Sequence, residues 1–96
     1  MFSYIYIIGS HHSPYKIGLS KTPKKRLQTL QTGHPETLFI HYTQEVAECD
    51  VKQIEAAIHK VIKYRQHRGE WFDIALEDAI SEIKFATIKW SRSSSL

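Results

Sequence analysis

Cysteine and long apolar runs are nearly absent from this chain of 96 residues. The single cysteine, Cys49, excludes an internal disulfide, and without a second cysteine a zinc site is poorly supported. No apolar run approaches the roughly 20 residues of a membrane span, and no basic segment precedes an apolar stretch at the N-terminus. The sequence therefore predicts a cytoplasmic protein, neither secreted nor embedded in a membrane, whose stability depends on packing.

Length and composition predict one small domain over residues 1–96. Hydrophobic residues make up 42% of the chain and charged residues 24%, which suits one core and one functional site. The net charge of +3 is compatible with a polyanionic partner but is common among ordinary domains. The distribution of charge is more informative, because five basic residues lie close together in the sequence: Lys16, Lys21, Lys24, Lys25 and Arg26.

Residues 3–8 and 15–18 both alternate and are separated by a turn that contains glycine, serine and proline, which predicts a β-hairpin. Successive strand residues point to opposite faces, so Tyr6 and Lys16 share one face if the isoleucines of both strands face the core. Tyr15 then points to the core side. A phenol and an ammonium on one face indicate a chemical site. Two ordinary strands that happen to carry these residues are the competing interpretation.

Three helices and a further strand complete the predicted fold. The expected elements are a helix between Thr22 and Gly33, a strand over residues 38–43, a helix after Asp50, a helix over about 76–90, and a Ser-rich tail over 91–96. The second helix is expected to carry a stripe at three-or-four spacing, formed by Val51, Ile54, Ile58, Val61 and Arg65. Together these elements predict an α+β fold, with a small three-stranded antiparallel sheet flanked by helices.

The first predicted helix carries Lys24, Lys25 and Arg26 in its first turn. The helix dipole disfavours positive charge there by about 0.3 to 1 kcal/mol at exposed positions, which indicates an external anion. Free backbone N–H groups and these three cations would form a phosphate cradle, and an arginine can bind two phosphate oxygens at once. A solvated basic face is the competing interpretation.

Glu55 and His59 are four residues apart on the second predicted helix and therefore neighbours on one side of it, beside the apolar stripe. The Glu55 carboxylate is a candidate ligand for Mg²⁺, which commonly binds one or two carboxylates with phosphate and water. His59 is a candidate for orienting a water or carrying a proton. A plain surface pair is the simpler alternative.

Other polar residues are weaker candidates. His11 and His12 are expected to decorate an exposed turn. Glu70 is either a ligand or a charged flank of the Trp71 and Phe72 pair, which is expected to close the core. His34 either faces the phosphate cradle or simply ends the helix.

These residues together resemble the GIY-YIG nuclease superfamily, and most of all its small phage and bacterial branch with Lys-Ile-Gly in the second motif. The resemblance covers residues 3–74. It depends on the order and spacing of six short features: Tyr4-Ile-Tyr6, Lys16-Ile-Gly18, Arg26, Gln31-Thr-Gly-His-Pro35, Glu55 with His59, and Gly69-Glu-Trp-Phe72.

The resemblance implies a DNA endonuclease that uses one divalent cation, Mg²⁺ or Mn²⁺. Carried over by position, Tyr6 is the first-motif tyrosine, Arg26 contacts the scissile phosphate and Glu55 binds the metal. The second-motif tyrosine falls on Lys16, which departs from the parent motif. We expect the Lys16 cation to favour the phenolate of Tyr6, so that the phenolate can take a proton from the attacking water, directly or through Lys16.

The remaining assignments follow from the same resemblance. His34 and His59 are second-tier candidates for positioning water or protonating the leaving group. Lys21, Lys24 and Lys25 are expected to join Arg26 in binding DNA.

Three functions are compatible with the sequence. They are an active endonuclease with a phage, mobile-element, repair or defence role, a catalytically weakened nucleic-acid-binding module, and a basic domain that binds a protein. Tyr6, Arg26 and Glu55 favour the first, whereas Lys16 favours the second. So short a chain has little surface for base readout, so a protein partner or homodimer is a candidate source of specificity.

Overall fold

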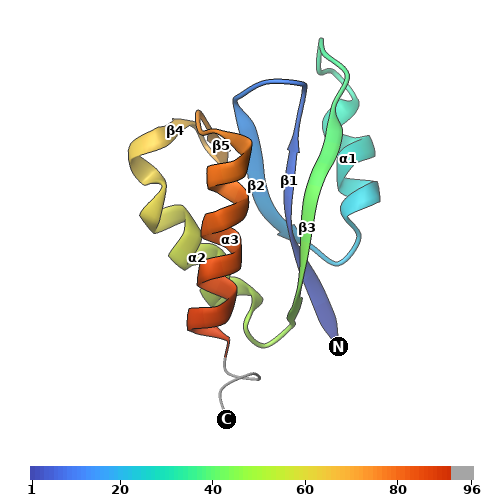
Figure 1. The fold of residues 1–96 in the computed structure, drawn as a ribbon. Coiled ribbons are helices and arrows are strands. Elements are labelled where there is room, and N and C mark those ends of the chain that lie inside the picture. The colour runs from blue at the N-terminus through green and yellow to red at the C-terminus, as the bar shows by residue number, and fades with distance from the viewer. Residues whose placement is uncertain (92–96) are drawn as a thin grey trace.

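The fold is seen in a computed structural model that describes residues 1–91, so that most of the predicted Ser-rich tail lies outside the described residues. The elements in chain order are β1 (Phe2–Gly9), β2 (Tyr15–Ser20), α1 (Pro23–Gln31), β3 (Phe39–Ala47), α2 (Val51–Val61), the 3-10 turn η1 (Lys63–Arg65), β4 (Gln66–Arg68), β5 (Trp71–Phe72) and α3 (Leu76–Trp90) (Figure 1). The α+β class predicted from the sequence is confirmed. No helix within residues 1–91 is long and apolar enough to cross a membrane.

The sheet has five antiparallel strands in the order β3-β1-β2-β5-β4, so the prediction of three strands was wrong in number. The three predicted strands form its main part. The two additional strands contain two and three residues, too few for alternation to be visible in the sequence. Their pairing is decided by long-range contact, since β5 aligns Trp71 with Lys16 and Phe72 with Tyr15.

The hairpin has the predicted facing of side chains. Tyr6 lies opposite Gly18, and Ile8 lies opposite Lys16, so Tyr6 and Lys16 share one face. Tyr15 belongs to the core cluster on the other face, as expected. The shared face is covered, however, because Tyr6 is only 1% exposed and Lys16 only 7%.

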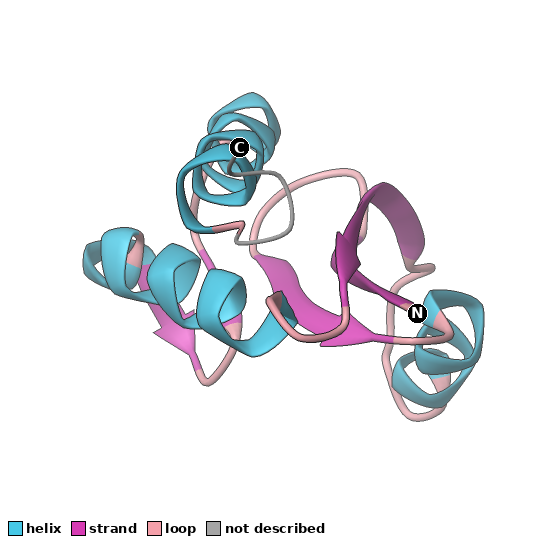
Figure 2. Ribbon diagram, turned by 90° about the horizontal axis from the view of Figure 1, so that it is seen from below, coloured by secondary structure: helices cyan, strands magenta, loops and turns pink. Residues whose placement is uncertain are grey.

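Helices cover both faces of the sheet. Figure 2 shows α1 on one side and the α2 and α3 pair on the other. The larger core lies under α2 and α3, and includes Ile5, Ile7, Ile17, Ile54, Ile58 and Ile83. A smaller cluster lies under α1, where Leu27 and Leu30 pack against the buried side chains of Tyr6, Ile8 and Leu38.

The predicted helix boundaries are close to those observed, but two details differ. Thr22 occupies the N-cap position of α1 without a side-chain capping hydrogen bond, and Gly33 ends the turn after α1 with a φ of 82°. In the second helix the apolar stripe continues to Ile62, which is 1% exposed, whereas Val61 is 52% exposed. Val61 is the last residue of α2, and Ile62 is its C-cap with a φ of −98° and a ψ of 10°, so regular helical spacing no longer decides which of the two side chains is buried.

Candidate functional site

Tyr6 and Arg26 form the first part of the site. The Nε–H of Arg26, on α1, donates to the Tyr6 hydroxyl at 3.4 Å. Gly18 on the neighbouring strand makes room for this hydroxyl, because a Cβ at position 18 would lie 2.6 Å from the Tyr6 oxygen and 3.2 Å from Oε1 of Glu70. Gly18 therefore allows the close approach of Tyr6 and Glu70.

The environment of Tyr6 keeps its hydroxyl protonated. Burial raises the pKa of the phenol above its usual value, and the carboxylates of Glu70 and Glu55 raise the pKa further. The hydrogen bond and charge of Arg26 act in the opposite direction but do not offset the burial. A phenol in this state can donate a hydrogen bond at neutral pH but is a weak base.

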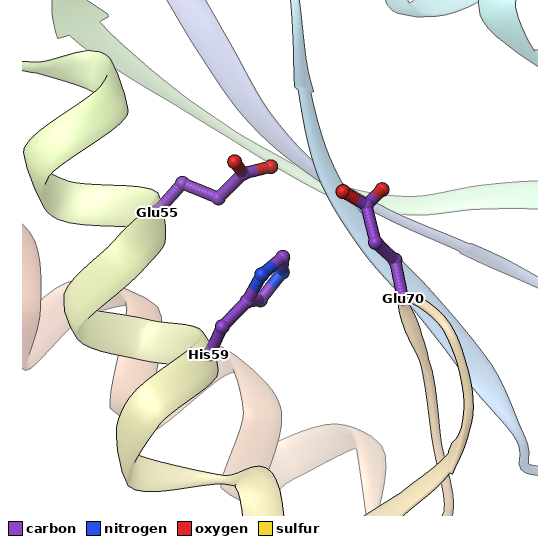
Figure 3. Close-up of side chains that lie close together, drawn as sticks. All are labelled: Glu55, His59 and Glu70. Carbon is purple, nitrogen blue, oxygen red and sulfur yellow. The ribbon is translucent and has the colours of Figure 1, made fainter.

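Glu55, His59 and Glu70 converge in the second part of the site, which we call the carboxylate cluster. One ligand atom from each residue lies within 4.8 Å of the others, and Figure 3 shows the three side chains pointing toward one another. Glu55 and His59 project from adjacent turns of α2, and Glu70 reaches in from the turn between β4 and β5.

Backbone contacts of Ile17 hold the carboxylate cluster against β2. The Nε2 atom of His59 donates to the carbonyl oxygen of Ile17 at 2.8 Å. The backbone N–H of Ile17 donates to the carbonyl oxygen of Glu70 at 3.0 Å. One residue of β2 therefore fixes both α2 and the β4–β5 turn. With Nε2 engaged as a donor, neutral His59 has Nδ1 as its acceptor.

The Glu55 carboxyl is partly buried, and this burial raises its pKa. Glu70 raises the pKa further by charge repulsion, while the charges of His59 and Lys16 and a hydrogen bond from the Leu19 backbone lower it. Two partly buried carboxylates that repel one another form an environment that a cation would stabilise.

Lys16 lies near this cluster but not in the predicted position beside the phenol. Its Nζ pairs with Oε1 of Glu70 at 3.1 Å and lies 6.0 Å from the centre of the Trp71 ring. The cation that contacts Tyr6 is Arg26. The expectation that Lys16 favours the Tyr6 phenolate is therefore wrong, because the Lys16 ammonium is drawn to the carboxylate of Glu70 instead.

The four predicted DNA-binding residues are in different environments. Lys21 is paired with Glu48 at 2.6 Å, while Arg26 contacts Tyr6. Lys24 and Lys25 are exposed. These two lysines line a surface hollow, which we call the α1 hollow, together with Tyr4, Thr22, Pro23, Ile40 and Thr43.

His34 lies near the site without entering it. Its ring stacks on Trp71 at 5.7 Å, and its Nδ1 lies 3.2 Å from both the backbone N and the carbonyl oxygen of Glu36. His11 and His12 are exposed on the turn after β1, as predicted. None of these three histidines belongs to the carboxylate cluster found among residues 1–91.

Comparison with known families gives a match that spans most of the chain. The profile of the T5orf172 domain matches residues 3–87. The chain belongs to the T5orf172 domain family. This domain is found in nuclease-like proteins of phages and bacteria. No curated protein and no solved structure matches the chain.

Sequence reasoning placed Glu55 and His59 together in this T5orf172 domain but gave too little weight to Glu70. The signal was present, because Glu70 follows Gly69, which adopts a positive φ of 56° in the observed turn. A glycine in a tight turn next to an acidic residue indicates a position from which a carboxylate can point toward a neighbouring element. Its partners could not be inferred, because they come from a distant part of the chain.

Proposed function

We propose that this T5orf172 domain is a GIY-YIG-type endonuclease that hydrolyses phosphodiester bonds of DNA with a single divalent cation, Mg²⁺ or Mn²⁺. The observation that carries the proposal is the convergence of Glu55, His59 and Glu70 next to the Tyr6 and Arg26 pair. The order and the spacing of these residues along the chain resemble those of the GIY-YIG motifs. The family match to a nuclease-like domain supports the same class of reaction.

The donor atoms of the carboxylate cluster fit a hard divalent cation. Glu55 and Glu70 offer carboxylate oxygens, which Mg²⁺ and Mn²⁺ prefer, and His59 lies beside them with Nδ1 directed away from its contact with Ile17 and able to hold a water. Glu55 would be the main ligand, because Glu70 also pairs with Lys16. When bound, the cation supplies charge stabilisation at the phosphate.

The protein side chains have separate tasks in this proposal. Arg26 uses Nε to contact Tyr6, and its terminal nitrogens donate to oxygens of the scissile phosphate. Tyr6 donates its hydroxyl hydrogen to a water or a phosphate oxygen, which orients that group. His59 accepts a proton at Nδ1, while its contact with Ile17 fixes the ring.

Lys16 takes a different task from the tyrosine that it replaces. It holds the Glu70 carboxylate near Gly18, so that this carboxylate stays oriented toward Glu55. Its charge also acts to lower the pKa of Glu55, against the effect of burial, and so favours the carboxylate form. Lys16 is therefore a positioning residue in this mechanism.

The test is cleavage of supercoiled, linear, single-stranded and branched DNA with Mg²⁺, Mn²⁺ or EDTA. We expect cleavage only with a divalent cation, and Glu55→Gln should reduce it by roughly 100-fold or more. Glu77→Gln, an exposed glutamate at the start of α3, is the matched control and should retain full activity. Cleavage in EDTA, or an active Glu55→Gln protein, would contradict the proposal.

One observation favours the alternative of a nucleic-acid-binding module with weakened cleavage. The Lys16 ammonium competes with a metal ion for the Glu70 carboxylate. In that case the protein would bind DNA but cleave none of the four substrates with either metal. Either function leaves sequence specificity to a protein partner or a second copy of the chain, as we expected from its small surface.

A further inference from the structure

A second surface hollow lies directly beside the carboxylate cluster, between the end of α2 and the β4–β5 turn. We call it the α2 hollow. It has a volume of about 450 Å³, and its lining includes His59, Lys60, Lys63, Gln66 and Gly69. His59 belongs to both the hollow and the carboxylate cluster, and Gly69 precedes Glu70. A ligand in the α2 hollow would therefore touch the border of the proposed active site.

The segment that surrounds the α2 hollow is strongly basic. Between Glu55 and Glu70 the chain has no acidic residue, while it carries four Lys or Arg residues: Lys60, Lys63, Arg65 and Arg68. None of these four forms an ion pair with another residue in the part of the chain that the structure describes. The positive charge here is thus open to an external anion.

The two lysines and Gln66 give the α2 hollow a set of hydrogen-bond donors. An ammonium donates only, and the Gln66 amide nitrogen donates to the carbonyl oxygen of Gly69 at 2.8 Å, which links β4 to the turn that follows it. Donors of this kind match phosphate oxygens. The α2 hollow therefore fits a phosphate of a nucleic-acid backbone.

The position of the α2 hollow suggests the path of the bound strand. Figure 1 places α1 and β4 on opposite flanks of β2, in agreement with the strand order of the sheet. The carboxylate cluster is attached to β2 and so lies between the α1 hollow, with Lys24 and Lys25, and the α2 hollow. Two basic surfaces thus flank one candidate active site.

We propose that the α2 hollow binds a backbone phosphate of the substrate strand next to the scissile one, through Lys60 and Lys63. This inference rests on the proposed nuclease function and defines its substrate further. The DNA strand extends beyond the cleaved bond on both sides, with one flank on α1 and the other at the end of α2. A substrate that ends at the scissile phosphate would lose one of these contacts.

Binding of a DNA oligonucleotide in EDTA, followed over a range of salt concentrations, tests the proposal without cleavage. The variant is Lys60→Gln with Lys63→Gln. The matched control is Lys52→Gln with Lys84→Gln, which removes the same charge from exposed lysines outside the α2 hollow. Each lost phosphate contact should reduce the slope of log affinity against log salt by roughly 0.7 to 0.9. We expect a reduction of about 0.7 to 0.9 for the variant, which loses one phosphate contact, and a clearly smaller one for the control.

Neutral methylphosphonates, placed singly along the strand, locate the contact. A methylphosphonate at one position beside the scissile bond should weaken DNA binding by the unmodified protein. The same methylphosphonate should have no further effect on DNA binding by the Lys60→Gln, Lys63→Gln variant. Lys60 also lies in the last turn of α2, where the helix dipole favours a cation, so urea unfolding must be measured for both double variants. A loss of stability alone, with binding equal to that of the control, would overturn the proposal.

The outcomes separate this inference from the function on which it rests. If the unmodified protein binds no DNA, the nuclease proposal fails as well. If it binds and cleaves DNA while the Lys60→Gln, Lys63→Gln variant has the salt dependence of the control, only the α2 hollow has been misassigned.

Discussion

The two faces of the sheet differ in what they bury. Under α2 and α3 lies a large core of almost entirely apolar side chains. Under α1 the buried apolar residues within positions 1–91 are three, namely Tyr6, Ile8 and Leu38, and Lys16 is buried near them. The buried residues of the first face form a packed apolar core, whereas the second face holds the Tyr6 and Arg26 contact and the Lys16 and Glu70 pair.

This difference shows how a small domain can combine stability with a polar site. Burying a charge or a phenol hydroxyl costs free energy, which a hydrogen bond or an ion pair offsets only in part. The large apolar face on the other side of the sheet must therefore stabilise the fold. Adjacent residues of α2 illustrate the division. Ile54 is fully buried in the core, and Glu55 lies at the edge of β2 in the carboxylate cluster.

The largest expected effect is on stability and comes from the α2 and α3 face. Ile54→Ala removes a fully buried side chain and should lower the free energy of unfolding by about 2 to 5 kcal/mol. Leu30→Ala, on α1, removes a partly exposed side chain and should cost about 1 kcal/mol. Urea unfolding of both variants would measure the difference, and equal losses would show that the two faces contribute alike.

The next effect is on cleavage and compares tyrosines on opposite faces of the hairpin. Tyr6→Phe removes the hydroxyl that contacts Arg26 and should lower the single-turnover rate by roughly 100-fold. Tyr15→Phe changes a side chain in the core and should leave the rate within about twofold. A severe loss for Tyr15→Phe with a mild one for Tyr6→Phe would mean that the catalytic face has been misidentified.

Lys16→Met sharpens the same comparison. Because Lys16 holds Glu70 toward Glu55 and does not pair with Tyr6, this change should raise the metal concentration needed for cleavage without moving the basic limb of the pH-rate profile. A shift of the basic limb would restore the expectation that Lys16 acts on the phenol. The measurement is the single-turnover rate against pH at saturating and limiting metal.

A smaller effect is expected at the glycine between the two parts of the site. Gly18→Ala places a Cβ 2.6 Å from the Tyr6 hydroxyl, so that the ring must move, and cleavage should fall by about tenfold. Gly33→Ala has no atom within 4 Å of its added Cβ but strains a φ of 82°. It should therefore lower stability by about 1 kcal/mol and leave the cleavage of the folded protein unchanged. Unfolding curves and rates of both variants separate the two causes.

The smallest effect concerns charge at the exposed end of α1. Lys24→Gln with Lys25→Gln should reduce the salt dependence of DNA binding, by roughly 0.7 to 0.9 for each phosphate contact that is lost. Lys21→Gln is the comparison, since Lys21 is paired with Glu48 and should contribute less. Unchanged binding in the double variant would indicate that the α1 surface is solvated and contacts no DNA.

The sequence alone determined the elements whose signals are local. Alternation placed Tyr6 and Lys16 on one face and Tyr15 on the other, and Thr22 and Gly33 marked the two ends of α1. Spacing on one helix also brought Glu55 and His59 together. These features depend only on the periods of the strand and the helix, so they can be read from neighbouring residues.

Only the tertiary structure decided which of these residues meet. Glu70 joins Glu55 because the short β4–β5 turn docks on β2, and Lys16 turns to that carboxylate instead of to Tyr6. The cation beside the phenol is Arg26, which comes from a separate helix. Such pairings depend on how segments far apart in the chain pack together and on which charges their burial leaves close to one another, and neither is encoded in local periodicity.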